Sequence, residues 1–139
     1  MLSGQLAADE SAAAFLTMRY ARPSACLALG EALRNCATSC IDISDGLLAD
    51  AAHIATASGV GLEIDSALLP FSEALGSLAD SEQSLDWALA GGDDYELLFT
   101  LPSSMPLPSG CTEMGRVLAG SGISCDRTPE HIGYDHFRR

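Results

Sequence analysis

Two short acidic segments contain the residue types best suited to chemistry. The first is Asp42-Ile43-Ser44-Asp45-Gly46-Leu47, which lies where a short apolar run passes into a helical pattern. Ligands of open α/β-type sheets gather at such carboxyl ends of strands. The carboxylates of Asp42 and Asp45 can point at one place, and with the Ser44 hydroxyl they supply the hard oxygen ligands that suit magnesium.

A purely structural role for this first segment stays open. Asp45 can serve only as a helix N-cap, which contributes about 1 kcal/mol. Asp42 can bond only to amides of the turn.

The second segment is Gly91-Gly92-Asp93-Asp94-Tyr95-Glu96, directly before an apolar strand pattern. Carboxylates crowded so closely repel one another unless a cation or a proton lies between them. The glycine pair lets the backbone approach a ligand closely. The alternative is a polar turn whose acidic side chains are only solvated.

The third segment, Gly133-Tyr134-Asp135-His136-Phe137, lies near the end of the chain. Tyr134 could stack on a flat heteroaromatic ring, above all a cationic one. The alternative is a tail that packs Phe137 on the core.

The charge balance narrows the classes of ligand. The sequence has 7 basic residues, all Arg, against 19 acidic ones, and a formal net charge of −12. Because a surface with this much negative charge repels phosphate backbones, nucleic acid is not an expected partner. A nucleotide would need metal ions between its phosphates and the carboxylates. Because Lys is absent, neither a P-loop lysine nor a Schiff-base lysine is present.

We expect a cytoplasmic protein that neither enters nor binds a membrane. Five cysteines lack zinc-like spacing and are interpreted as reduced thiols. The first ten residues do not resemble a signal peptide, and no apolar run approaches the roughly 20 residues of a membrane span.

The elements that must position these segments follow from periodicity and turn residues. Helices are predicted at 9–20, 23–35, 45–58, 71–78 and 81–89, and strands at 39–43, 60–65, 95–101 and 112–118. In the third helix Leu47, Leu48, Ala51, Ile54 and Ala55 form an apolar stripe, and His53 is interpreted as a residue of the helix face. Helices and strands mix without a strict repeat, which predicts an α+β fold with a mixed β-sheet packed with helices.

Several segments together resemble the thiamine-monophosphate kinase family. Arg19-Tyr20-Ala21-Arg22-Pro23 resembles the entry to that family's carboxy-terminal domain, and Asp42 to Ile54 resembles its DISDGL-x-x-D-x-x-H-I segment. Ala90 to Thr100 is similar to its GGEDYELLFT strand, and Gly115-Arg116-Val117 and the Gly133–Phe137 tail complete the order. The resemblance implies a fold like the carboxy-terminal domain of aminoimidazole ribonucleotide synthase.

The resemblance also implies roles for single residues. Asp42 and Asp45 would bind Mg²⁺, Ser44 would touch the phosphates of ATP, Asp93 would contact thiamine phosphate, and Tyr134 would contact its aromatic portion. The family usually has Glu where this chain has Asp93, which reaches less far. The implied reaction is ATP-dependent phosphorylation of thiamine phosphate to thiamine diphosphate, with no acid or base residue assigned.

Family members are roughly twice as long as this chain, and the amino-terminal half that holds much of their nucleotide site is not in it. We therefore expect residues 1–18 to be a helical lead-in and 19–139 a carboxy-terminal domain that needs an amino-terminal domain or partner chain, with a homodimer possible. Alone it is expected to be inactive. The alternatives are a module that binds a ligand without turnover and a structural remnant.

Overall fold

A computed structural model describes residues 10–129. In chain order its elements are α1 (Glu10–Ala21), α2 (Leu27–Leu33), β1 (Ser39–Asp42), α3 (Leu47–Ser58), β2 (Gly61–Ile64), the 3-10 turn η1 (Ser66–Leu68), α4 (Glu73–Gly76), α5 (Ser81–Ala90), β3 (Leu97–Thr100), β4 (Gly115–Leu118) and β5 (Gly122–Cys125).

The strands form two small sheets. β1 and β3 pair antiparallel, with Ser39 opposite Thr100 and Asp42 opposite Leu97. In the second sheet β2 lies between β4, to which it is antiparallel, and β5, to which it is parallel. This mixture of strand directions, with helices packed on it, confirms the predicted α+β fold.

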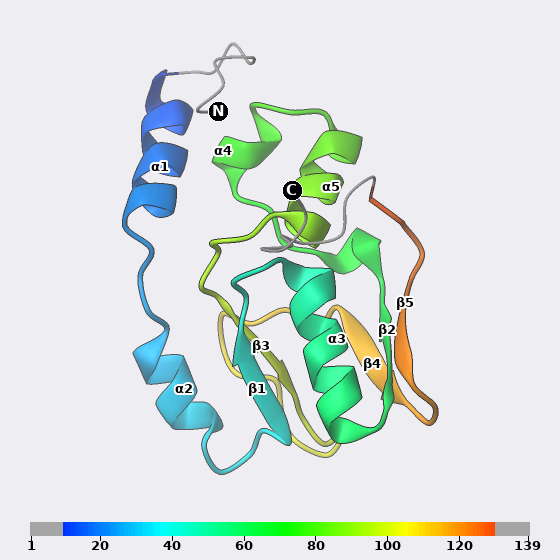
Figure 1. Cartoon of the computed structure of the whole chain (residues 1–139). Helices are drawn as coiled ribbons and strands as arrows, with labels where there is room; N and C mark the ends of the chain where they lie inside the picture. Colours follow the sequence, from blue (N-terminus) through cyan, green and yellow to red (C-terminus); the bar gives the residue numbers. More distant parts are fainter. Residues whose placement is uncertain (1–9, 130–139) are drawn as a thin grey trace.

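Helix α3 joins the two sheets into one core. It contacts β1, β2, β3 and β5, and it crosses in front of both sheets in Figure 1. All five residues of the predicted stripe are buried: Leu47, Leu48, Ala51, Ile54 and Ala55. The helix ends at a glycine in the left-handed conformation, Gly59 with φ 65°, where a side chain would be strained.

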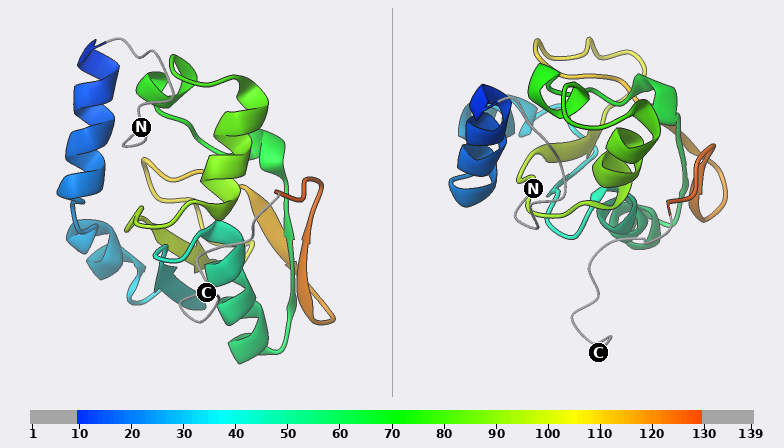
Figure 2. Two further views of the ribbon diagram at one scale, coloured as in Figure 1. Left: turned by 45° about the horizontal axis from the view of Figure 1, so that its top comes forward. Right: turned by 90° about the horizontal axis from the view of Figure 1, so that it is seen from above.

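The remaining helices surround this core. α5 contacts α3 and α4, whereas α1 lies along the flank of the molecule, where it contacts α4 (Figure 2). A salt bridge of 2.6 Å between Arg19 Nη2 and Glu96 Oε1 ties the end of α1 to the loop before β3. Within residues 10–129 no helix is long and apolar enough to span a membrane.

The structure departs from the sequence-based expectation at α2, β1 and β5, each time for a physical reason. The second helix begins at Leu27 and not at Pro23, because the Cys26 thiol donates a hydrogen bond to Glu96 Oε2 at 3.2 Å and holds the preceding segment against another loop. β1 is only half-buried, since its residues alternate in exposure. β5 was not predicted, because Gly-Ile-Ser-Cys is a weak strand sequence that depends on pairing with β2.

Leu89, fully buried at 0% exposure where α5 meets the core, gives a test of the packing. We expect Leu89→Ala to lower the free energy of unfolding by about 2–5 kcal/mol, because it removes buried methyl groups and leaves a cavity. Leu27→Ala, at a side chain 75% exposed, should change it by less than about 0.5 kcal/mol. Urea unfolding followed by circular dichroism measures both, and equal losses would contradict this core.

Candidate functional site

The first acidic segment forms the turn between β1 and α3. β1 ends at Asp42, and Gly46 occupies the N-cap position of α3 with φ 116° and without a side-chain cap. A Cβ at Gly46 would lie 2.9 Å from the carbonyl oxygen of Ala90, so glycine lets this turn touch the end of α5. The expectation that Asp45 caps the helix is therefore wrong, because the chain enters α3 in a conformation that places Gly46 there.

A buried carboxylate from inside α3 holds this turn in place. Asp50 Oδ2 accepts hydrogen bonds from the backbone N–H of Ser44 at 2.8 Å and of Asp45 at 3.1 Å. Asp50 is 2% exposed. These two turn amides are thus bonded by Asp50 and not, as the structural alternative supposed, by Asp42.

The second acidic segment docks directly on the first. The N–H of Asp93 donates to Ser44 O, the N–H of Tyr95 to Ile43 O, and the N–H of Ile43 to Glu96 O, each at 2.9 Å. The last two bonds extend the pairing of β1 with β3 toward the turn. Backbone contacts therefore join the two motifs.

The backbone of this second loop is unusual at two positions. Asp93 has φ 66° and Tyr95 has φ 55°, both in the left-handed region that side chains other than those of Gly, Asn and Asp rarely adopt. The docking bonds on the Asp93 and Tyr95 amides hold the loop in this conformation. Strain of this kind persists only where surrounding contacts determine it.

The charges of acidic side chains from both segments influence the hydroxyl of Tyr95. This hydroxyl donates a hydrogen bond to Asp93 Oδ1 at 3.2 Å. Its pKa is raised above the ordinary value, first by this bond and the charge of Asp93, then by partial desolvation and the charges of Asp42 and Asp45. The structure thus brings the segment that contains Asp42 and Asp45 against the segment that contains Asp93, two segments that are separate in the sequence.

The other acids of the loop have different surroundings. Glu96 accepts hydrogen bonds from Arg19 and from Cys26. The bond with Cys26 raises the pKa of the Cys26 thiol. Partial withdrawal from water, with the charges of Glu96 and Asp93, raises the pKa of Asp94 to about 6, which Arg19 opposes. Glu96 therefore ties the loop to the entry segment, whereas Asp94 is the acid most easily protonated near neutral pH.

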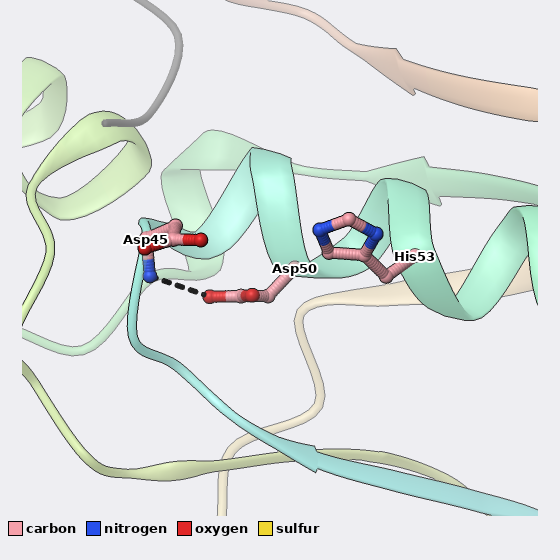
Figure 3. A group of neighbouring side chains, drawn as sticks. All are labelled: Asp45, Asp50 and His53. Carbon is pink, nitrogen blue, oxygen red and sulfur yellow. Dashed lines mark hydrogen bonds between the residues drawn. The ribbon is translucent and has the colours of Figure 1, made fainter. Parts of the chain in front are cut away.

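Asp45, Asp50 and His53 form a second group of ligand-type side chains. Each offers an atom within 4.8 Å of the others, the one such group in residues 10–129. Figure 3 shows Asp50 bonded to the Asp45 amide and His53 on the same side of α3. His53 is exposed on the helix face, as its sequence position predicts.

Two features of the site were missed by sequence reasoning. The anchoring role of Asp50 had a signal, because position 50 falls on the apolar stripe of α3 between Leu47 and Ile54, where a polar residue needs a partner. The salt bridge between Arg19 and Glu96 had no signal in the sequence, because it joins distant parts of the chain. Tyr134 lies outside the described residues, and its role stays a prediction.

Gly92 tests the docking of the two loops. A Cβ at Gly92 would lie 2.5 Å from Ser44 O, closer than packed atoms tolerate. We expect Gly92→Ala to lower the free energy of unfolding by about 1–3 kcal/mol through overpacking. Gly76→Ala is the control, because no atom lies within 4 Å of its added methyl group. Chemical denaturation measures both variants, and a Gly92→Ala protein as stable as wild type would contradict the docking.

The raised pKa of Asp94 predicts a pH-dependent stability. The fold favours the protonated acid, so its contribution is complete below the ordinary pKa of 3.8 and is lost as pH rises through about 6. Asp94→Asn, which cannot ionise, should be more stable than wild type at pH 7.5, and the difference should vanish near pH 4. Thermal unfolding across this range measures it.

Asp86→Asn is the control of opposite sign. The hydrogen bond from Arg127 lowers the pKa of Asp86, so that ion pair stabilises the fold above the ordinary pKa and its loss should destabilise the protein at pH 7.5. A constant stability difference between Asp94→Asn and wild type from pH 4 to 7.5 would show that the pKa of Asp94 is not raised.

Curated thiamine-monophosphate kinases match nearly the whole chain. The protein of Escherichia coli K12 is 43% identical over an alignment 147 positions long, which covers 94% of this chain and 45% of that protein. The protein of Aquifex aeolicus is 40% identical over 126 residues, which cover 88% of this chain and 41% of that protein. The chain thus spans a little under half the length of these relatives. No family model matches it.

Solved structures give the same result for the fold. AaThiL complexed with AMPPCP and TMP matches with a TM-score of 0.83 and 39% identity, over 93% of this chain and 43% of that one. Thiamine-monophosphate kinase from Stenotrophomonas maltophilia K279a matches with a TM-score of 0.77 and 37% identity, over 86% and 41%. The predicted resemblance is confirmed: by sequence and by fold, this chain resembles a little under half of a thiamine-monophosphate kinase.

Proposed function

We propose that this chain forms the carboxy-terminal part of an enzyme that transfers the γ-phosphoryl group of ATP to thiamine phosphate, giving thiamine diphosphate. One observation carries the proposal: backbone hydrogen bonds of 2.9 Å, among them that from the Asp93 N–H to Ser44 O, hold together the two acidic segments that resemble the family's motifs. The relative complexed with AMPPCP and TMP supports it, because AMPPCP is an ATP analogue and TMP fits the phosphate acceptor of a thiamine-monophosphate kinase.

Asp42 and Asp45 would hold Mg²⁺. Several carboxylates facing one place repel one another, and their oxygens are the ligands that Mg²⁺ takes in phosphoryl-transfer sites. When bound, the metal would neutralise charge on the transferring phosphoryl group. The donor set at the β1–α3 turn fits this ion, and the net charge of −12 makes cations necessary for binding two polyanions.

The other residues would position the substrates. Ser44 would touch the ATP phosphates, and Asp93, whose Oδ1 accepts a hydrogen bond from the Tyr95 hydroxyl, would contact thiamine phosphate. Tyr134 would contact the aromatic portion of thiamine. Because one backbone bond joins Ser44 and Asp93, the two substrates would be held in a fixed relation, which is the main requirement of phosphoryl transfer.

The chain would work only with the rest of the site. In this proposal residues 1–18 are the lead-in, 19–139 are the carboxy-terminal domain, and an amino-terminal domain or partner chain supplies further nucleotide contacts. A homodimer and a cytoplasmic location belong to the same proposal. Alone, the chain would be inactive. A binding module without turnover and a structural remnant are the competing functions.

Complementation tests the proposed function. The assay measures ATP- and Mg²⁺-dependent formation of thiamine diphosphate by the chain alone and mixed with an amino-terminal half from a relative. We expect activity only in the mixture. Asp42→Asn should lower it by about 100-fold or more, since it removes a charged ligand of the metal that would neutralise the reacting phosphates.

The matched control is Glu113→Gln, which removes an exposed acid from the loop before β4 and should leave the activity unchanged. Saturable Mg²⁺-nucleotide binding without turnover in the mixture would favour the binding module. Neither binding nor turnover by a folded chain would favour the structural remnant.

A further inference from the structure

The buried carboxylate of Asp50 is not among the residues that the proposed reaction uses, yet it is one of the most buried polar side chains described. It is 2% exposed and lies on the core-facing side of α3. Burying a carboxylate is costly unless hydrogen bonds satisfy it. Here one oxygen, Oδ2, accepts the N–H groups of two consecutive turn residues, Ser44 and Asp45.

We propose that Asp50 is the positioning residue of the β1–α3 turn, and this inference rests on the function proposed above. Asp42 is held independently, because it is paired with Leu97 at the end of the β1–β3 ladder. Ser44 and Asp45 lie beyond the ladder, next to Gly46 with its φ of 116°. The two hydrogen bonds to Asp50 therefore fix the direction in which Ser44 and Asp45 present their side chains.

The same bonds act on the second loop. Ser44 donates its N–H to Asp50 and accepts the N–H of Asp93 through its carbonyl. A turn that moved after loss of Asp50 would take the Asp93 contact with it. Removal of Asp50 is thus expected to disturb both the ATP side and the acceptor side of the site.

A second role for Asp50 is chemically possible, because Asp45, Asp50 and His53 offer ligand atoms within 4.8 Å of one another. Asparagine distinguishes the two roles. Its carbonyl oxygen can accept both N–H groups at the position of Oδ2, but it is neutral and a much weaker ligand for a hard cation. Positioning by hydrogen bonds survives Asp50→Asn, whereas a ligand role does not.

The first arm of the experiment uses the 139-residue chain alone. Amide proton shifts and hydrogen exchange of Ser44 and Asp45 are measured by NMR in wild type, Asp50→Asn and Asp50→Ala. We expect slowed exchange of both amides in wild type and Asp50→Asn, and its loss in Asp50→Ala. Fast exchange of both amides in wild type overturns the inference, and this arm does not depend on kinase activity.

The second arm measures kcat and KM for Mg²⁺-ATP and thiamine phosphate in the complementation mixture. We expect Asp50→Ala to lower kcat by about 100-fold, as misplacement of catalytic groups by about 1 Å does. Asp50→Asn should stay within about ten-fold of wild type, far above Asp42→Asn. An Asp50→Asn loss as large as that of Asp42→Asn, with both amides still protected, makes Asp50 a cation ligand and overturns the inference.

Asp126→Ala is the matched control for stability. Asp126 also accepts two hydrogen bonds, from the N–H and the hydroxyl of Ser66 at 2.8 Å each, but away from the two loops. Its loss should destabilise the protein without changing the Ser44 and Asp45 amides or kcat. If Asp50→Ala does not fold, the amide and kinetic behaviour of Asp50→Asn decides. An inactive mixture with wild-type chain refutes the proposed kinase function and leaves the NMR arm to judge Asp50.

Discussion

The candidate site depends on the backbone groups of Ser44. Its N–H points into the core, where Asp50 accepts it, and its carbonyl points to the second loop, where the N–H of Asp93 donates to it. One residue thereby connects the core helix α3, the turn with Asp42 and Asp45, and the loop with Asp93. Glycine at positions 46 and 92 makes this possible, because a methyl group at either would lie within 3 Å of a carbonyl oxygen of the facing segment.

The hydrogen bonds of Ser44 hold together two acidic segments whose like charges repel one another. Asp42, Asp45 and Asp93 all raise the pKa of the Tyr95 hydroxyl, and the pKa of the Asp94 carboxyl is raised to about 6. Like charges are therefore concentrated where the backbone is also strained. Such an arrangement lowers stability, and proteins keep it where function needs it. Cations at this place would relieve the repulsion, so the features that weaken the fold also favour the proposed Mg²⁺-dependent chemistry.

Much of the fold could be predicted because its signals are local. The stripe from Leu47 to Ala55 has helical period, and Gly59 is a typical helix end. The short strands were predicted with boundaries too wide, because pairing with a partner, and not propensity, decides where a strand of four residues stops. β5 has little strand propensity of its own and could not be predicted without β2 beside it.

The candidate site was predicted as separate segments but not as an arrangement. Family resemblance indicated Asp42, Ser44, Asp45 and Asp93, yet the contact between their two segments requires the pairing of β1 with β3, a long-range contact that no local pattern encodes. Local rules also favoured Asp45 as the helix cap. They failed there because the N-cap position falls on Gly46, where the close contact with the carbonyl oxygen of Ala90 requires glycine.

Manganese relaxation mapping tests most directly the claim that a cation held by Asp42 and Asp45 lies in a site that the two loops share. Mn²⁺ accepts the same oxygen ligands as Mg²⁺, and as a paramagnetic ion it broadens nearby amide resonances. At low Mn²⁺, the amides of 42–46 and 92–96 should broaden together, while the acidic start of α5, Asp80 to Glu82, about 15 Å away along the helix, stays sharp. Broadening of one loop alone, or equal broadening at the start of α5, would contradict a shared site.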